Sequence, residues 1–192
     1  MVVFDMHNNN DEDLSFKKLF IPLTTFKAIH IIIILGLLVF GNALFNDFVW
    51  DDKSFILFSS DIHTVNISYL IGQNIFNGAG EYRPIPAIYF ASLYSLFTTN
   101  VFFYHLFQIV IHITNTVLLF FLFKHFFSKQ IGLFLSLIFL VHPIQVESVS
   151  YIAASGNPLF FLFGITALLM SFKRIVMQKG YSLYLSYYYS HF

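Results

Sequence analysis

The apolar run Val101–Phe123 contains no Lys, Arg, Asp or Glu, and this feature restricts the possible folds most strongly. As an α-helix, its roughly 23 residues would reach about 35 Å, enough to cross a hydrocarbon core of about 30 Å. Charged residues make up 10% of the chain and hydrophobic residues 57%, whereas soluble domains carry about 25% charged residues. The sequence therefore predicts an all-α polytopic transmembrane bundle in a lipid bilayer and excludes a water-soluble globular domain.

Further apolar segments raise the expected number of spans to about four. The predicted parts are a cytoplasmic tail (1–26), spans at 27–45, 101–123, 131–142 and 151–172, an extracytoplasmic loop (46–100) and the tail of a truncated chain (173–192). The third span is short because Pro143 limits it. A signal peptide is the alternative interpretation of the first segment.

The distribution of charge predicts the orientation. Of the ten Lys and Arg residues, all but Lys53 and Arg83 lie on one side of the predicted spans. This asymmetry predicts a cytoplasmic N-terminus, provided that Ile85–Phe97 forms an interfacial or re-entrant helix in the outer loop. The expected location is the plasma membrane of a prokaryote or the endoplasmic reticulum of a eukaryote. A net charge of zero predicts no nucleic-acid partner, and the absence of cysteine excludes disulfides and thiolate chemistry.

An acidic pair, Asp51 and Asp52, follows the first predicted span directly. Two adjacent carboxylates can bind a divalent cation such as Mg²⁺ or Mn²⁺ through their oxygen atoms, or one of them can act as a general base. The neighbouring Trp50 would lie at the level of the lipid headgroups. The alternative is an acidic cap on a helix that begins at Lys53.

A basic residue also stands out in the predicted outer loop, within Glu81-Tyr82-Arg83-Pro84. The planar guanidinium of Arg83 can bind a phosphate group through two hydrogen bonds, and Pro84 suits the first turn of a helix. An interfacial arginine that reaches the lipid headgroups is the alternative interpretation.

The span 101–123 carries four polar residues on one helical face, namely His105, Gln108, His112 and Asn115. His105 is nearest the outer end, which makes it a candidate for contact with a substrate. For the other three residues we favour hydrogen bonds between helices.

A turn follows the third predicted span, with the sequence His142-Pro143-Ile144-Gln145-Val146-Glu147-Ser148. Because a Pro-induced turn separates them, His142 and Glu147 are expected to face the same outer cavity as Asp51. Capping of a following helix by Glu147 is the alternative.

These motifs together resemble the GT-C superfamily of membrane glycosyltransferases, and in particular the N-terminal part of the transmembrane O-mannosyltransferases with tetratricopeptide repeats and of their bacterial relatives. The resemblance rests on the ordered motifs Phe48-Val49-Trp50-Asp51-Asp52, Tyr82-Arg83-Pro84, Tyr104-His105-Leu106-Phe107-Gln108 through His112, and His142-Pro143-Ile144-Gln145-Val146-Glu147-Ser148-Val149 leading to Tyr151-Ile152. The chain departs from the family pattern at Ala154-Ser155-Gly156-Asn157, where the family usually has a Gly-Arg-x-Asp type of sequence, and at Gln108, where it usually has Asn.

The resemblance implies that a sugar is transferred from a polyprenyl-phosphate carrier to a protein or glycan acceptor on the extracytoplasmic face, with inversion at the anomeric carbon. It implies a catalytic or metal-binding role for Asp51 or Asp52, and donor contacts for Arg83 and His142. A non-catalytic membrane scaffold or subunit, or an inactive truncated paralogue, is the competing hypothesis. A transporter, suggested by the polar face of the span 101–123, is a third.

Overall fold

The computed structural model describes residues 23–72 and 82–190, with side chains described up to residue 174. Every regular element in this part is helical, which confirms the predicted fold class. The elements are α2 (Thr25–Phe40), η1 (Gly41–Phe45), η2 (Lys53–Leu57), α3 (Ser60–His63), α4 (Ile67–Gly72), α5 (Pro84–Phe97), α6 (Val101–Phe123), α7 (Lys129–Val141), α8 (Gln145–Ser150), η3 (Ile152–Ser155) and α9 (Gly156–Ser190). Most of the predicted N-terminal tail, and Glu81, lie outside the described residues.

Local sequence signals explain where several helices begin. The Thr24 hydroxyl accepts a hydrogen bond from the Lys27 N–H (3.2 Å) at the start of α2, and the Ser128 hydroxyl accepts one from the Ile131 N–H (3.5 Å) at the start of α7. Such caps satisfy N–H groups that have no partner within the helix. Pro84 lies in the first turn of α5, as the sequence predicted.

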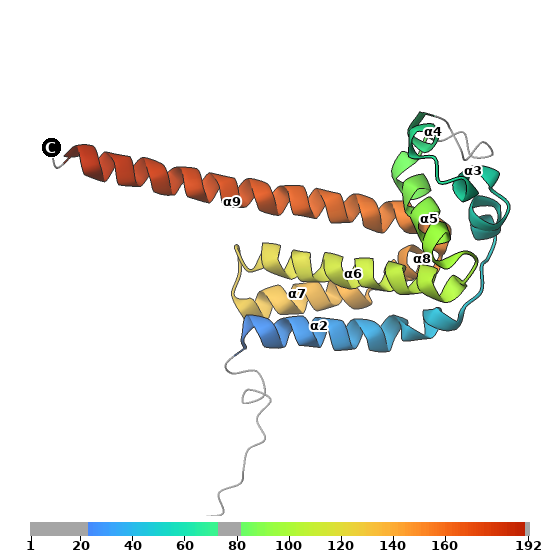
Figure 1. Cartoon of the computed structure of the whole chain (residues 1–192). Helices are drawn as coiled ribbons and strands as arrows, with labels where there is room; N and C mark the ends of the chain where they lie inside the picture. Colours follow the sequence, from blue (N-terminus) through green and yellow to red (C-terminus); the bar gives the residue numbers. More distant parts are fainter. Residues whose placement is uncertain (1–22, 73–81, 191–192) are drawn as a thin grey trace, which may run out of the picture.

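The helical bundle is organised around α6, which contacts α2, α7 and α9 (Figure 1). Gly36 of α2 permits a close approach to α6, because a Cβ atom at this position would lie 2.7 Å from Cγ1 of Ile113. Small residues at such contacts allow two helix backbones to come near each other. The buried apolar residues of this core are Leu23, Ala28, Ile32, Phe40, Ala43, Ile109, Ile113, Phe120, Leu133, Leu140 and Val149.

A second apolar core lies at one end of the bundle, in what we call the outer lobe (residues 46–72 and 82–100). Here α3 and α4 pack against α5, which runs across the end of the bundle rather than alongside α6 (Figure 1). Tyr104 from the first turn of α6 and Ile152 of η3 reach into this core and join the lobe to the bundle. The lobe therefore stands on the end of the bundle where α8 and α9 begin.

In the described part of the chain, three helical segments are long and apolar enough to cross a membrane: Thr25–Phe45, Val101–Phe123 and Ile152–Arg174. The region predicted as the span 131–142 forms α7, which has 13 residues and reaches only about 20 Å. Helix α7 ends at Val141, just before the turn that contains Pro143. The predicted span 151–172 is mostly part of α9, whose backbone continues as a helix to Ser190.

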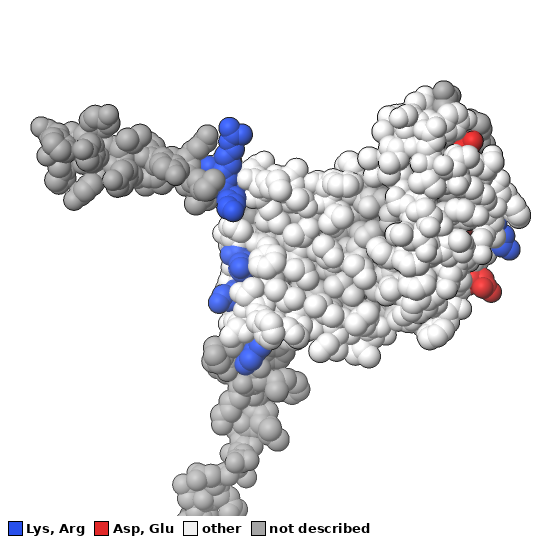
Figure 2. Space-filling model, viewed as in Figure 1, with Lys and Arg blue, Asp and Glu red and all other residues white. Residues whose placement is uncertain are grey.

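The charged side chains separate along the bundle axis. Figure 2 shows most of the visible Lys and Arg gathered at the end of the bundle away from the outer lobe, whereas the visible Asp and Glu, with one basic patch beside them, lie at the lobe end. Lys27 lies in the first turn of α2, and Lys124 and Lys129 flank the α6–α7 turn. Lys173 and Arg174 lie in α9, about 17 residues after its start. This separation is the one that the charge pattern of the sequence predicts.

Candidate functional site

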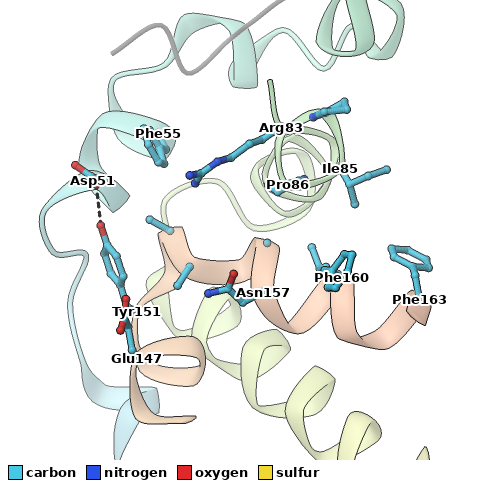
Figure 3. A pocket seen from close by; sticks show the side chains of 15 residues that line it. Asp51, Phe55, Arg83, Ile85, Pro86, Glu147, Tyr151, Asn157, Phe160 and Phe163 are labelled. Atoms are coloured by element: carbon cyan, nitrogen blue, oxygen red, sulfur yellow. Dashed lines mark hydrogen bonds between the residues drawn. The ribbon is translucent and has the colours of Figure 1, made fainter. Parts of the chain in front are cut away.

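A cavity of about 680 Å³ opens where the outer lobe meets the bundle. Its volume falls within the range of small-molecule sites, about 300–1,000 Å³. Its lining comes from the segment 51–55 that leads into η2, the start of α5, α8 with the following η3, and the start of α9 (Figure 3). The lining residues of interest are Asp51, Phe55, Arg83, Ile85, Glu147, Tyr151, Asn157, Phe160 and Phe163.

Asp51 presents its carboxylate to this cavity and is held by Tyr151. The Tyr151 hydroxyl donates a hydrogen bond to Asp51 Oδ2 over 3.0 Å (Figure 3). The Trp50 ring packs edge-on against the Tyr151 ring, with 6.0 Å between the ring centroids. Trp50 is 82% exposed and has a φ of +44°, in the left-handed region that bulky residues avoid. An aromatic pair and a strained turn thus place Asp51 at the cavity.

Asp52 has a different environment, although it is the next residue. Its side chain is 0% exposed. Oδ1 accepts a hydrogen bond from the Ala153 N–H over 2.6 Å, and Oδ2 accepts one from the Val49 N–H over 3.1 Å. Asp52 therefore ties the loop before η2 to η3, and it is not the cap of a helix beginning at Lys53, because it makes no such side-chain hydrogen bond.

These environments also change proton affinities. Burial raises the pKa of Asp52, and the neighbouring Asp51 charge adds to the rise, whereas the hydrogen bonds from backbone N–H groups act in the opposite direction. Burial and the contact with Asp51 raise the pKa of Tyr151 to about 12. At neutral pH, Tyr151 is therefore a permanent hydrogen-bond donor to Asp51.

The cavity has a polar end and an apolar end. Arg83, the residue before α5, extends its side chain across the cavity toward Phe55, and Asn157 points up from α9 (Figure 3). Glu147 of α8 lies at the same polar end, near Tyr151. Phe160 and Phe163 follow along α9 and form an apolar wall with Ile85 (Figure 3). The structure thus brings together Asp51, Arg83 and Glu147, three residues proposed from separate motifs.

The two histidines proposed from the sequence do not line this cavity. His105 is fully buried in the first turns of α6, beneath the outer-loop residues Asn46 and Asp47. His142 follows α7, is exposed, and accepts a hydrogen bond from the Ile144 N–H at Nδ1 (3.2 Å). This hydrogen bond lies within the turn at Pro143, and His142 does not join Asp51 in the lining of the cavity as the sequence predicted.

The deeper polar residues of α6 form hydrogen bonds between segments, as the sequence predicted. Gln108 donates to the Ser148 carbonyl (3.4 Å) and Asn115 to the Pro158 carbonyl (2.9 Å). His112 Nε2 lies 3.0 Å from the Leu140 carbonyl oxygen. These contacts join α6 to α7, α8 and α9.

Sequence reasoning did not identify Tyr151 and Asn157 as site residues. A helical spacing was available as a signal for Tyr151, because it follows Glu147 by four residues and so shares its face. Asn157 was noted only as a departure from a family pattern. Its place in the cavity depends on how α9 begins beside α5.

The two aspartates do not fit a shared metal site. Both oxygens of Asp52 accept backbone N–H groups and its side chain is buried, so Asp52 is inaccessible to an ion in the cavity. Within residues 23–72 and 82–174, no three His, Cys, Asp or Glu side chains converge on one point, so a cation in the cavity would have at most two such ligands there. Among the residues that the structure describes, Asp51 and Glu147 are the carboxylates that line the cavity.

Comparison with known proteins identifies several relatives. Protein O-mannosyl-transferase TMTC3 from Mus musculus is 30% identical over 152 residues, which cover 75% of this chain and 16% of the relative. The human protein of the same name is 30% identical over 151 residues, covering 74% and 16%. Protein O-mannosyl-transferase tmtc2 from Xenopus laevis is 32% identical over 161 residues, covering 78% and 19%. The chain thus spans less than a fifth of the length of these three relatives.

No family model matches the chain, and no solved structure matches it. The relatives nevertheless agree with one another in name, and the apolar helices agree with an integral membrane protein. Over about three quarters of its length, this chain is a membrane-embedded homologue of the protein O-mannosyl-transferases, the family that its sequence motifs predicted.

Proposed function

We propose that this chain forms the donor-binding and catalytic part of a membrane glycosyltransferase, which transfers a sugar from a polyprenyl phosphate to an acceptor on the extracytoplasmic face. The observation that carries this proposal is the outer cavity, in which Asp51 and Arg83 share one space with an apolar wall. The names of the relatives support mannose as the sugar and a protein as the acceptor, and a glycan acceptor is the alternative.

The division of the cavity suits a lipid-linked sugar phosphate. Arg83 would bind the phosphate, since a guanidinium forms paired hydrogen bonds with phosphate oxygens. The wall of Ile85, Phe160 and Phe163 would contact the first units of the polyprenyl chain, because burial of apolar surface favours binding. The sugar would then lie between Arg83 and Asp51.

Asp51 is the residue that we assign to proton transfer. The acceptor hydroxyl oxygen forms a bond to the anomeric carbon while the bond from that carbon to the phosphate oxygen breaks. The hydroxyl proton passes to the Asp51 carboxylate, and polyprenyl phosphate leaves with its new negative charge facing Arg83. Attack opposite to the leaving group inverts the anomeric configuration.

A divalent cation predicted from the sequence, Mg²⁺ or Mn²⁺, would take its protein ligands from Asp51 and Glu147, the carboxylates that line the cavity. When bound it would supply positive charge beside the donor phosphate. Removal of divalent cations with EDTA, followed by addition of Mg²⁺ or Mn²⁺, would measure the dependence of transfer on such an ion.

The proposed orientation places the outer lobe outside the cytoplasm and the lysine-rich end inside, in the endoplasmic reticulum of a eukaryote or the plasma membrane of a prokaryote. A glycosylation reporter inserted after Phe97 should therefore be modified. An unmodified reporter at this position would contradict the orientation.

The function is tested with membranes that contain the chain, a radiolabelled polyprenyl-phosphate mannose and a protein acceptor. Asp51→Asn keeps the size of the side chain but removes its basicity, so transfer should fall by about 10²- to 10⁴-fold. The matched control is Asp47→Asn, because Asp47 is an exposed outer-loop carboxylate that does not line the cavity.

Two results would contradict the proposal in different ways. Equal transfer by wild type and Asp51→Asn would remove Asp51 from the chemistry. The second result is a wild type that binds the donor but does not transfer the sugar, with the binding lost in Arg83→Met. That result would favour the non-catalytic subunit or the inactive paralogue.

A further inference from the structure

A second cavity, of about 180 Å³ and partly open, lies where α6, α7, α8 and α9 meet, and we call it the inner cavity. Five of its lining residues are polar, namely His112, Asn115, Gln145, Ser148 and Asn157, and Phe139, Pro158 and Phe161 add apolar surface. Empty cavities in proteins are apolar, whereas polar cavities of sufficient size contain water. The volume has room for about six water molecules at about 30 Å³ each. Composition and size therefore both indicate a hydrated space.

Asn115 offers this cavity an unused acceptor. The residue is 1% exposed, and its amide nitrogen donates to the Pro158 carbonyl over 2.9 Å. Its carboxamide oxygen is buried and has no hydrogen-bond partner in the described part of the chain. An unsatisfied oxygen is unfavourable in a bundle that faces lipid, because no bulk water is there to replace the missing partner. A bound water molecule would satisfy it.

His112 supplies a second acceptor one turn earlier on α6. Its Nε2 atom pairs with the Leu140 carbonyl, and because a carbonyl only accepts, Nε2 carries the hydrogen. In the neutral ring, Nδ1 is then an acceptor. The Ser148 hydroxyl and the amides of Gln145 and Asn157 provide donors around the same space. Bound water typically forms two to four hydrogen bonds, and this lining offers both donors and acceptors.

Asn157 lines both this inner cavity and the larger outer one. This polar side chain is therefore common to the linings of both cavities. We propose that the inner cavity is a water-binding site, filled from the outer cavity past Asn157, whose ordered waters hydrogen-bond to Asn115 and His112. This inference concerns hydration of the bundle and stands whether or not the chain transfers a sugar.

The test is hydroxyl-radical labelling of the chain in lipid nanodiscs, with X-rays generating the radicals from water and mass spectrometry locating the modified residues. Phe139 and Phe161 line the inner cavity and their rings stack with 5.1 Å between centroids, so we expect both to be labelled. Phe120 is a fully buried core residue outside the cavity, and Phe134 is an exposed apolar residue of α7. Both controls should show little labelling. Core packing excludes water from Phe120, and the surrounding lipid excludes water from Phe134.

Two variants identify the source of the water. Asn115→Leu removes the acceptor, and Asn157→Leu places an apolar side chain in the lining that the two cavities share; each should reduce labelling of Phe139 and Phe161 to the level of Phe120. Wild-type labelling of Phe139 and Phe161 no greater than that of Phe120 would overturn the proposal. Labelling unchanged in a folded Asn157→Leu variant would overturn the entry route. The wild-type result decides the hydration even where a variant does not fold.

Discussion

The helical bundle and the outer lobe hold their polar groups in opposite ways. In the bundle, side chains such as Gln108 and Asn115 donate hydrogen bonds to backbone carbonyls of neighbouring segments. In the outer lobe, carboxylates accept: Asp52 from two backbone N–H groups and Asp51 from Tyr151. The bundle therefore depends on neutral contacts and close packing, as a lipid environment favours. The lobe concentrates negative charge where the cavity opens and where chemistry is possible.

The difference between the bundle and the outer lobe is tested most directly by substitution of Asp52. Asp52→Ala removes the acceptor of two backbone N–H groups, the part-buried one of Val49 and the buried one of Ala153. A buried N–H group left without a partner costs about 1–3 kcal/mol. We expect the free energy of unfolding in detergent to fall by about 3 kcal/mol. The control is Asp47→Ala, an exposed change in the same loop, which should alter it little. An equally small effect of Asp52→Ala would mean that the lobe does not depend on this carboxylate.

The same residue predicts a pH dependence that the bundle does not share. Because the pKa of Asp52 is raised above its ordinary value of 3.8, the folded chain binds this proton more tightly than the unfolded chain does. The part of the Asp52 contribution to stability that depends on binding this proton is thus complete below pH 3.8 and is lost as the pH rises through the raised value.

Asp52→Asn isolates this contribution, since it does not titrate and retains one acceptor oxygen. At neutral pH it should lower the free energy of unfolding by about 2 kcal/mol, the effect of one unpaired N–H group. Unfolding measured from pH 7 downward should show wild type gaining stability relative to Asp52→Asn. A stability difference that shrinks on acidification would contradict the raised pKa.

How much of each region could be predicted depends on how far apart in the sequence its contacting residues lie. Apolar runs predicted the helices of the bundle, and Asp51, Arg83 and Glu147 could be found because each lies in a short motif at the end of a helix. The role of Asp52 was hidden, since its partner Ala153 lies about a hundred residues away in the sequence. His142 was expected at the cavity but does not line it, and its ring accepts a hydrogen bond within the adjacent turn. Spacing identifies neighbours on one helix, whereas contacts between distant segments require the fold.

In the bundle, the corresponding test concerns the close packing of α2 against α6 at Gly36. Gly36→Ala would place Cβ 2.7 Å from Cγ1 and 2.9 Å from Cδ1 of Ile113, so α2 and α6 or the Ile113 side chain must shift. Overpacking of this kind typically costs about 1–3 kcal/mol, and we expect about 1.5 kcal/mol in detergent unfolding. Gly164→Ala is the matched control, because open space surrounds that position. Equal stability of the two variants would show that the α2–α6 contact is loose.

The smallest expected effect on stability comes from removing a single tyrosine hydroxyl. The same substitution, Tyr to Phe, is compared at Tyr151 and at Tyr104. Tyr151→Phe removes the hydroxyl that donates to Asp51 at the open cavity. Tyr104→Phe removes a hydroxyl that donates over 2.8 Å to the Thr98 carbonyl, on a ring buried at the junction of lobe and bundle. Each lost hydrogen bond should lower the free energy of unfolding by about 1 kcal/mol, measured by the same detergent unfolding. Only Tyr151→Phe should also reduce transfer in the membrane assay, because only Tyr151 orients the carboxylate assigned to proton transfer. If both variants lowered transfer equally, the two hydroxyls would act only through the fold of the lobe. The Tyr151–Asp51 hydrogen bond would then have no specific role in transfer.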